Sequence, residues 1–336
     1  MPAGAAPTVV WTPNVEIIML LANLTEAGPT FQPKAVSTMR RAAWLRFDGD
    51  RRAPAVTETA RLLEKGFWLD ALAELALAAE PFPKAGFTYP LAHDTLLKAG
   101  DDRDDGYTRL ERYLEYAAAF TLDADVLEFL KLQGNAYRAA VEELEISLGP
   151  SNWVGPVEAW FGTAHRSVLT VGSLLLPAGF SFGFSLGTPD GAYAFALLGP
   201  FIGQDGSTSF TDTDAARTSS ERELIRAFVK PVMAGSPDAM LQFDRAFRGN
   251  LPHWRPLGYD RAAACLEDHL VHAVQARLLV RRGEADAAAG MVRYDEENGF
   301  VFARPLAEGL EDYELHRAEF PTLDAFFPHL MDYLLQ

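Results

Sequence analysis

Apolar residues recur with helical spacing along the first 148 residues of the chain. Intervals of three and four residues place apolar side chains on one side of a helix. Capping residues, and a proline near the first turn of one segment, mark where such helices begin. We predict a loose arm over residues 1–14, followed by helices over residues 15–24, 36–47, 54–65, 67–80, 104–120, 123–132 and 135–148.

The pattern changes at a turn cluster over residues 149–152, which reads G-P-S-N. Beyond this cluster, short apolar runs are separated by glycine, proline and aspartate, which is typical of strands joined by tight turns. We therefore predict an antiparallel meander. Its strand-like runs cover residues 157–165, 167–176, 179–186 and 192–198.

A further helix is predicted over residues 218–231, which read T-S-S-E-R-E-L-I-R-A-F-V-K-P. Ser220 and Glu223 have the spacing of a capping box, and Pro231 disfavours helical geometry at Lys230, so we expect the helix to end there. Its buried stripe comprises Leu224, Ile225, Phe228 and Val229. Periodicity alone would place the charged residues off that stripe, Arg222, Glu223 and Arg226, on a solvent-exposed face of the helix.

The remaining pattern predicts a long helix over residues 260–281, a last strand over 299–303, and closing helices over 306–317 and 323–335. Together these elements indicate an α+β fold. We expect a mainly helical region over residues 1–150 to pack on a region over residues 151–336 that contains a small, mainly antiparallel sheet.

Composition narrows the classes of function. The chain has 336 residues, of which 49% are hydrophobic and 23% charged, as in ordinary soluble globular proteins. A net charge of −16 without a basic block argues against nucleic acid and anionic membranes as partners. The single cysteine excludes an internal disulfide framework. No signal-peptide pattern is visible, so a cytoplasmic location is the default expectation.

The segment over residues 222–231 resembles the central helix of a bacterial family of uncharacterised zincin-like, gluzincin-type metallopeptidases. That helix reads H-E-F-x-H-x-F-x-N-P in the family and R-E-L-I-R-A-F-V-K-P here. Arg222 and Arg226 replace the two histidines, Lys230 replaces the asparagine, and Glu223 is kept. An early V-E-I-I-M run and a V-E-A-W-F-G run also match in order. The resemblance implies a zincin-like fold for residues 151–336, with a sheet over this helix whose edge strand can accept a peptide.

The departure from H-E-x-x-H changes the chemistry. In that motif two imidazoles one turn apart hold zinc and the glutamate is the general base. A guanidinium group has no lone pair to give a metal, so we expect no zinc, and Glu223 would be a vestigial general base. The resemblance places a third ligand at Asp268, with Glu267 beside it. We expect Arg226 and Arg222 to pair with these carboxylates and with Glu223.

Three functions follow from these residues. The first is a metallopeptidase-like pseudoenzyme that binds a peptide or protein. The second is an active hydrolase whose metal has moved to Cys265, His269 and His272, which lie at i, i+4 and i+7 on one predicted helix face. The third is a structural or adaptor protein whose helices form the interface.

Other catalytic motifs are absent from the sequence. There is no G-x-S-x-G, and neither Ser185 nor Ser167, which follows His165 and Arg166, lies on a strand-turn-helix elbow. There is also no P-loop and no G-x-G-x-x-G, so nothing in the chain favours nucleotide binding.

Overall fold

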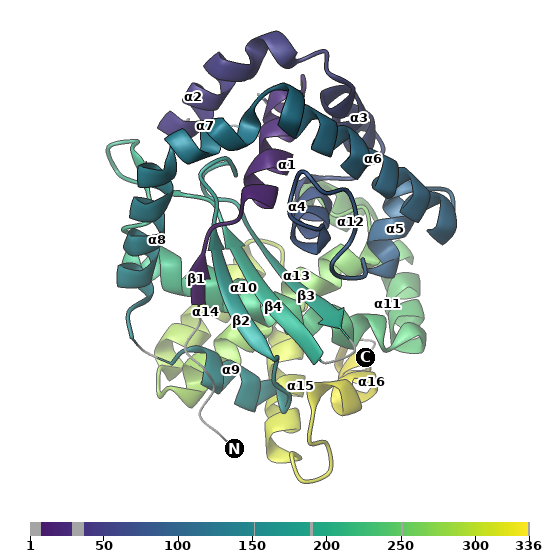
Figure 1. Cartoon of the computed structure of the whole chain (residues 1–336). Helices are drawn as coiled ribbons and strands as arrows, with labels where there is room; N and C mark the ends of the chain where they lie inside the picture. The colour runs from purple at the N-terminus through teal and green to yellow at the C-terminus, as the bar shows by residue number, and fades with distance from the viewer. Residues whose placement is uncertain (1–7, 29–36, 151, 189–190, 250, 335–336) are drawn as a thin grey trace.

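The computed structural model describes residues 8–28, 37–150, 152–188, 191–249 and 251–334. It has the expected α+β class, in which many helices surround one small sheet (Figure 1). The predicted helices of the first 148 residues are confirmed, apart from residue 36, which lies outside the described residues. They are α1 (Pro13–Leu24), α2 (Thr38–Phe47), α3 (Pro54–Glu64), α4 (Leu69–Ala78), α6 (Arg103–Asp123), α7 (Val126–Leu132) and α8 (Gly134–Leu148), with α5 (His93–Ala99) in addition.

The central sheet contains β1 (Thr8–Val10), β2 (Ser167–Gly172), β3 (Ser181–Thr188) and β4 (Gly191–Leu198) in the order β1-β2-β4-β3. Only β3 and β4 pair antiparallel, whereas β1 with β2 and β2 with β4 are parallel. The prediction of a mainly antiparallel meander was therefore wrong. After β2 the chain runs to the far edge of the sheet, where it forms β3, and then turns back as β4 between β2 and β3. Among the described strands of this sheet, β3 and β4 are therefore the one antiparallel pair.

The strands predicted over residues 157–165 and 299–303 were also wrong. The predicted loose arm over residues 1–14 contains strand β1. Within 157–165 the apolar run belongs to helix α9 (Val154–Phe161), because Val157, Trp160 and Phe161 recur at helical spacing and are buried on one side. Residues 299–303 form a turn leading into α15 (Ala303–Leu315). Both runs are too short for their periodicity to separate a strand from a helix.

Helix α10 (Thr213–Ala234) is longer than predicted at both ends. The residue that caps it is Asp212, whose side chain accepts a hydrogen bond from Ala215 N, so the predicted capping box at Ser220 was wrong. Pro231 lies inside the helix rather than ending it. Val232 and Met233 beyond it are buried, and this packing outweighs the backbone bond that proline cannot make.

The rest of the C-terminal half is helical apart from a two-stranded hairpin, β5 (Phe201–Ile202) with β6 (Thr208–Ser209). The helices predicted over residues 260–281, 306–317 and 323–335 correspond to α13, α15 and α16, although α15 begins three residues earlier than predicted and residue 335 lies outside the described residues. Helices α11, α12 and α14 were not predicted. Their bounds are α11 (Pro237–Gly249), α12 (Leu251–Trp254), α13 (Ala262–Arg281), α14 (Ala285–Glu297) and α16 (Leu323–Leu334), and short 3-10 turns cover Asp48–Asp50 and Arg255–Leu257.

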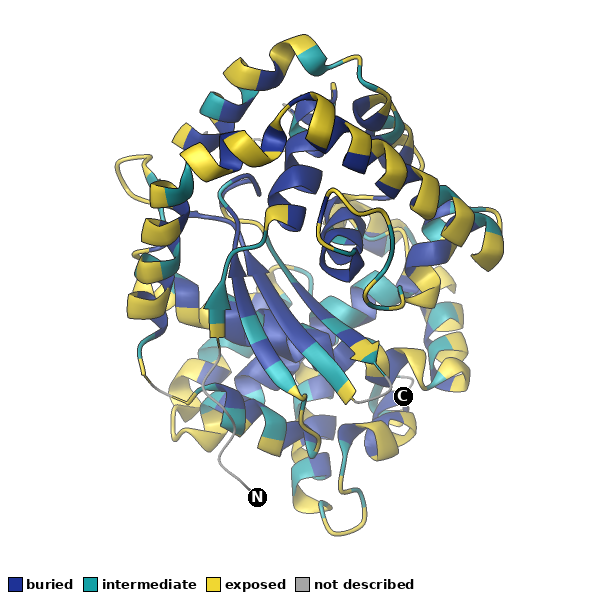
Figure 2. Cartoon of the chain, in the orientation of Figure 1, coloured by how far each residue is buried: buried dark blue, intermediate teal, exposed yellow. Residues whose placement is uncertain are grey.

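Two large hydrophobic cores pack against the sheet. Much of β2, β3 and β4 is dark blue, and so buried, in Figure 2. One core contains α1, α4 and α6 with Phe184, Phe195 and Leu197 of the sheet. The other contains α10, α13, α15 and α16 with Val168 and Ala194. The sheet thus contributes to both cores, and the proposed division of the chain near residue 150 stays a prediction.

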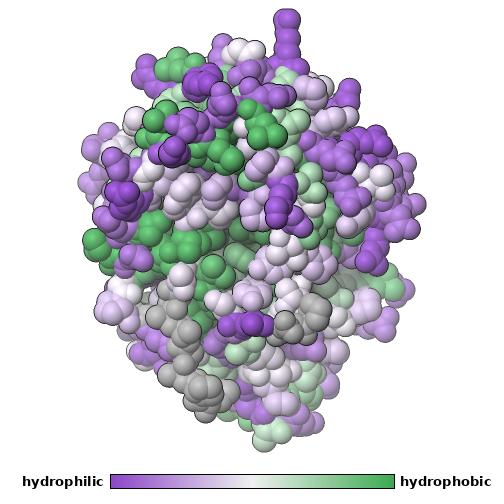
Figure 3. Space-filling model, in the orientation of Figure 1, coloured by the Kyte–Doolittle hydropathy of each residue, from purple (hydrophilic) through white to green (hydrophobic). Residues whose placement is uncertain are grey.

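One face of the sheet is only partly covered by helices. Leu169, Phe182 and Tyr193 pack against the first core but remain partly exposed. In Figure 3 hydrophobic side chains form a green band across the middle left of the view, over α8 and the strands beside it. No helix in the described ranges is both long and apolar enough to cross a membrane.

The other face of the sheet lies directly on α10. A Cβ added at Gly183 would come 2.0 Å from the carbonyl oxygen of Glu223, so β3 and α10 touch through their backbones. This confirms that the strands over residues 167–198 pack near the helix that contains Arg222 and Arg226.

Candidate functional site

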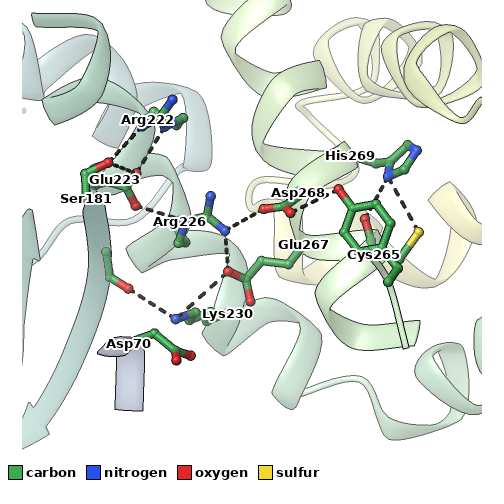
Figure 4. Close-up of polar contacts among 12 residues, drawn as sticks. Asp70, Ser181, Arg222, Glu223, Arg226, Lys230, Cys265, Glu267, Asp268 and His269 are labelled. Carbon is green, nitrogen blue, oxygen red and sulfur yellow. Dashed lines mark hydrogen bonds and ion pairs between the residues drawn. The ribbon is translucent and has the colours of Figure 1, made fainter. Parts of the chain in front are cut away.

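The charged residues of α10 lie between β3 and α13 rather than in solvent (Figure 4). The side chain of Glu223 is only 1% exposed and that of Arg226 is 17% exposed. A buried charge is costly unless it is paired and hydrogen-bonded, so partners must be present within the site. The assignment of this face to solvent on periodicity alone was therefore wrong.

Arg226 pairs with three carboxylates from two helices. Its Nε donates to Glu223 Oε2 at 2.9 Å, and its Nη1 donates to Glu267 Oε1 at 2.5 Å and to Asp268 Oδ1 at 2.9 Å. The planar guanidinium suits this arrangement because its donors have a fixed geometry. The ion pairs predicted from the sequence for Arg226 are confirmed.

Arg222 completes the coordination of Glu223 from the other side. Its Nε donates to Glu223 Oε1 at 3.0 Å, and its Nη2 donates to Ser181 Oγ at 2.8 Å. The Ser181 hydroxyl in turn donates to Glu223 Oε1 at 2.8 Å. Both oxygens of Glu223 therefore accept from neighbouring side chains, whereas a general base needs a lone pair directed at the proton that it removes.

The electrostatics of the site keep Arg226 charged. Burial alone would lower the pKa of its guanidinium, but Glu223, Glu267 and Asp268 outweigh burial and raise the pKa well above its ordinary value. A guanidinium that is always protonated cannot coordinate a metal. The donors at the two histidine positions of the H-E-x-x-H frame therefore do not fit the zinc that the fold resemblance implies.

Lys230 lies one turn beyond Arg226, at the free edge of β3. Its Nζ donates to Gly183 O at 3.4 Å and lies 3.9 Å from Glu267 Oε1. It also lies 5.1 Å from the centroid of the Phe184 ring. Sequence reasoning gave Lys230 no role, because its contacts depend on where the edge of the sheet lies.

The alternative metal residues on α13 have other partners. His269 Nδ1 lies 2.7 Å from Cys265 O, and His272 Nδ1 lies 2.9 Å from Asp295 Oδ1. Burial raises the pKa of the Cys265 thiol to about 12 and lowers the pKa of His269 to about 4. Within the part of the chain that the structure describes, no three histidine, cysteine, aspartate or glutamate side chains are placed to hold a metal ion.

The structure brings together a serine and a histidine that the sequence did not connect. His165 Nε2 lies 2.9 Å from Ser185 Oγ. The other ring nitrogen, Nδ1, is buried and has no hydrogen-bond partner among the described residues. Burial lowers the pKa of His165 to about 4. A catalytic histidine needs an acidic group on its second nitrogen to stabilise the imidazolium, so this pair lacks the third member of a triad.

The small residues of β3 are the signal that sequence reasoning missed. Residues 181, 183, 185 and 187 read Ser, Gly, Ser, Gly at every second position. Side chains at alternate strand positions share a face, and here that face lies against α10, where Gly183 touches the helix and Ser181 reaches Glu223. The alternation indicates a close strand–helix contact.

A family model described as a domain of unknown function, DUF4932, matches residues 65–333, a range that includes α10, α13 and the strands β2, β3 and β4 but not β1. No curated protein and no solved structure matches the chain. The chain belongs to the DUF4932 family, a domain of unknown function.

Proposed function

We propose that this protein is a metallopeptidase-like pseudoenzyme, which has lost zinc and catalysis and binds an extended peptide or protein segment. The observation that carries the proposal is the network around Arg226. One guanidinium at a position that would hold a zinc ligand pairs with the carboxylates that would serve as base and third ligand. Its positive charge neutralises these carboxylates as a metal cation would.

The edge of the sheet supports peptide binding as the retained activity. Among the described residues, β3 pairs with β4 and with no strand on its other side. Gly199 N donates to Phe180 O, and in an antiparallel pair such bonded positions alternate with unbonded ones. The backbone N–H and C=O groups of Ser181, Gly183, Ser185 and Gly187 therefore point away from β4, as an added strand requires.

The proposal is tested by zinc content and by peptidase activity. The purified protein, after incubation with excess zinc and dialysis, should contain no stoichiometric zinc by elemental analysis. Generic peptide substrates should be hydrolysed no faster by the parent than by the Glu223→Ala variant. Stoichiometric zinc bound through α10, or hydrolysis that Glu223→Ala abolishes in a folded protein, would show that the protein is an active metallopeptidase.

A further inference from the structure

The free edge of β3 carries an ammonium-binding arrangement that the chain fills with its own Lys230. Three acceptors surround this ammonium group: the Gly183 carbonyl oxygen, the Glu267 carboxylate and the face of the Phe184 ring. A carbonyl, a carboxylate and an aromatic face are the groups that bind alkylammonium ions. We call these three acceptors the ammonium box.

The surroundings of the box favour positive charge. Asp70, at the start of α4, lies near Lys230 in Figure 4 and pairs with Lys98 at 3.4 Å. Burial alone would raise the pKa of Asp70, but Lys98 and Lys230 hold it below its usual range. The whole chain carries a net charge of −16, which attracts a basic partner and repels an acidic one.

Lys230 blocks the edge at its centre. The Gly183 carbonyl that it covers points away from β4 and is an acceptor that an added strand would use. Charged side chains and covering helices at a sheet edge commonly prevent unwanted strand pairing, and here the lysine comes from helix α10 rather than from the strand. At 3.4 Å and 3.9 Å its polar contacts are longer than strong charge-assisted bonds, and its side chain is 33% exposed. Lys230 can therefore be exchanged for another ammonium group at small cost.

We propose that the β3 edge binds an extended basic peptide, and that a lysine side chain of this peptide replaces Lys230 in the ammonium box. The inference rests on the proposed peptide-binding function and names the partner's chemistry. A residue directly opposite Gly183 on an added strand directs its side chain to the same face as Gly183, which is the face of α10 and Glu267. The main-chain N–H of this peptide lysine donates to the Gly183 carbonyl oxygen, and its ammonium group pairs with Glu267.

The test compares two labelled heptapeptides with the full chain by fluorescence anisotropy. Both peptides are acetylated and amidated; one alternates valine with lysine, and the other has glutamate in place of lysine. The Lys230→Met variant removes the competing ammonium group but keeps an unbranched side chain. It should bind the lysine peptide about tenfold more tightly than the parent does, because one charged hydrogen-bond partner is freed. Neither protein should bind the glutamate peptide.

A matched control is Lys131→Met on α7, which removes an exposed lysine that pairs with Glu128 at 3.3 Å. It should bind both peptides as the parent does. The Ser185→Pro variant removes an outward-pointing N–H without removing a bond to β4, so it should abolish binding of the lysine peptide to Lys230→Met.

The possible results separate the inference from the proposed function. Equal affinity of parent and Lys230→Met for the lysine peptide, lost in Ser185→Pro, would overturn the ammonium box but keep the β3 edge as the docking site. A preference for the glutamate peptide would overturn the basic partner. If no variant binds either peptide, both the box and strand addition at β3 are wrong, whereas the loss of zinc and catalysis is judged separately by the zinc and peptidase assays.

Discussion

Arg226 is the side chain whose removal should destabilise the fold most within the site. The Arg226→Met variant leaves Glu223, Glu267 and Asp268 close together without their shared cation. Because Glu223 is 1% exposed, water cannot solvate its charge. Breaking a buried ion pair in this way costs about 3–5 kcal/mol of the free energy of unfolding, which urea denaturation at neutral pH measures.

Arg222 provides the matched control. It forms an ion pair with Glu223 and donates to Ser181 Oγ, and its side chain is 32% exposed. Arg222→Met should therefore cost about 1 kcal/mol, as partly solvated pairs do. Equal losses for the two variants would mean that the network around Arg226 does not act as a buried unit.

A second buried carboxylate predicts how stability depends on pH. Glu16 is fully buried on α1, where its Oε2 accepts from Tyr137 Oη at 2.9 Å and from Leu175 N at 3.1 Å. Burial outweighs these bonds and raises its pKa from 4.5 to about 7. The folded state thus holds a proton that the unfolded state releases, so the stabilisation is complete below about pH 4.5 and is lost as the pH rises through 7.

The Glu16→Gln variant isolates this contribution. Glutamine cannot ionise, so between pH 5 and pH 8 the parent should lose about 2.5 kcal/mol of its free energy of unfolding relative to the variant. Urea unfolding of both proteins at the two pH values measures the difference. Parallel pH profiles for parent and variant would show that Glu16 titrates normally.

The sequence predicted some contacts of the site residues and not others, and the difference has a physical reason. The pairing of Arg226 with Glu223 and Asp268 could be predicted because the H-E-x-x-H frame fixes which helix positions face one centre, whereas in the described part of the chain Arg222 pairs with Glu223 but not with the carboxylates of α13. The contacts of Ser181 and Lys230 could not be predicted, since their roles depend on the register of β3 against α10. That register is a tertiary property, and no local pattern in either segment specifies it.

At the scale of elements, β3 and α10 can approach closely because Gly183 has no side chain. A Cβ at Gly183 would lie 2.0 Å from Glu223 O, whereas a Cβ at Gly187 meets no atom within 4 Å. Gly183→Ala must push the strand from the helix and should cost about 1–3 kcal/mol, as other overpacking substitutions do. Gly187→Ala, in the same strand, should change stability by less than about 0.5 kcal/mol.

Urea unfolding compares the two alanine variants directly, and the lysine heptapeptide gives an independent readout. Gly183→Ala should also weaken binding of this peptide, since it displaces the strand that would receive it. If Gly183→Ala is as stable as Gly187→Ala, the strand and helix do not touch as described.

The elements that sequence patterns predicted well are those with long, regular periodicity. Helices α3, α6 and α8 bury residues mainly at intervals of three and four along one side, so their helical period is clear. The errors fall on short runs, such as α9, and on Pro231, where packing overrides a local signal. The strand order was also missed, because β1 joins the sheet from a segment far away in the sequence.

At the scale of the whole molecule, the site exists only because distant segments meet. α10 and α13 belong to one core, and β3 joins that core to the other through the face that carries Phe184. The family match over residues 65–333 includes all of these segments. Because α10 and α13 pack together, substitutions on α10 can test whether a zinc site can be built between these two helices.

The double variant Arg222→His and Arg226→His would recreate H-E-x-x-H on a helix that is regular from Thr213 to Ala234. Imidazoles at i and i+4 can face one metal, and Arg226 Nη1 now lies 2.5 Å from Glu267 and 2.9 Å from Asp268, so a carboxylate ligand is within reach. We expect this variant to bind zinc, measured by calorimetric titration, and to gain thermal stability when zinc is added. The parent should show neither effect.

Replacing the carboxylates on α13 identifies the third ligand. Adding Asp268→Asn or Glu267→Gln to the double variant should weaken zinc binding about 10-fold or more for the residue that coordinates, and less for the other. If the double variant folds yet binds no more zinc than the parent, α10 does not occupy the position of a zincin metal helix, and the arginine network arose in an unrelated fold. If it binds zinc tightly and also hydrolyses peptides, the two arginines alone separate this protein from an active metallopeptidase.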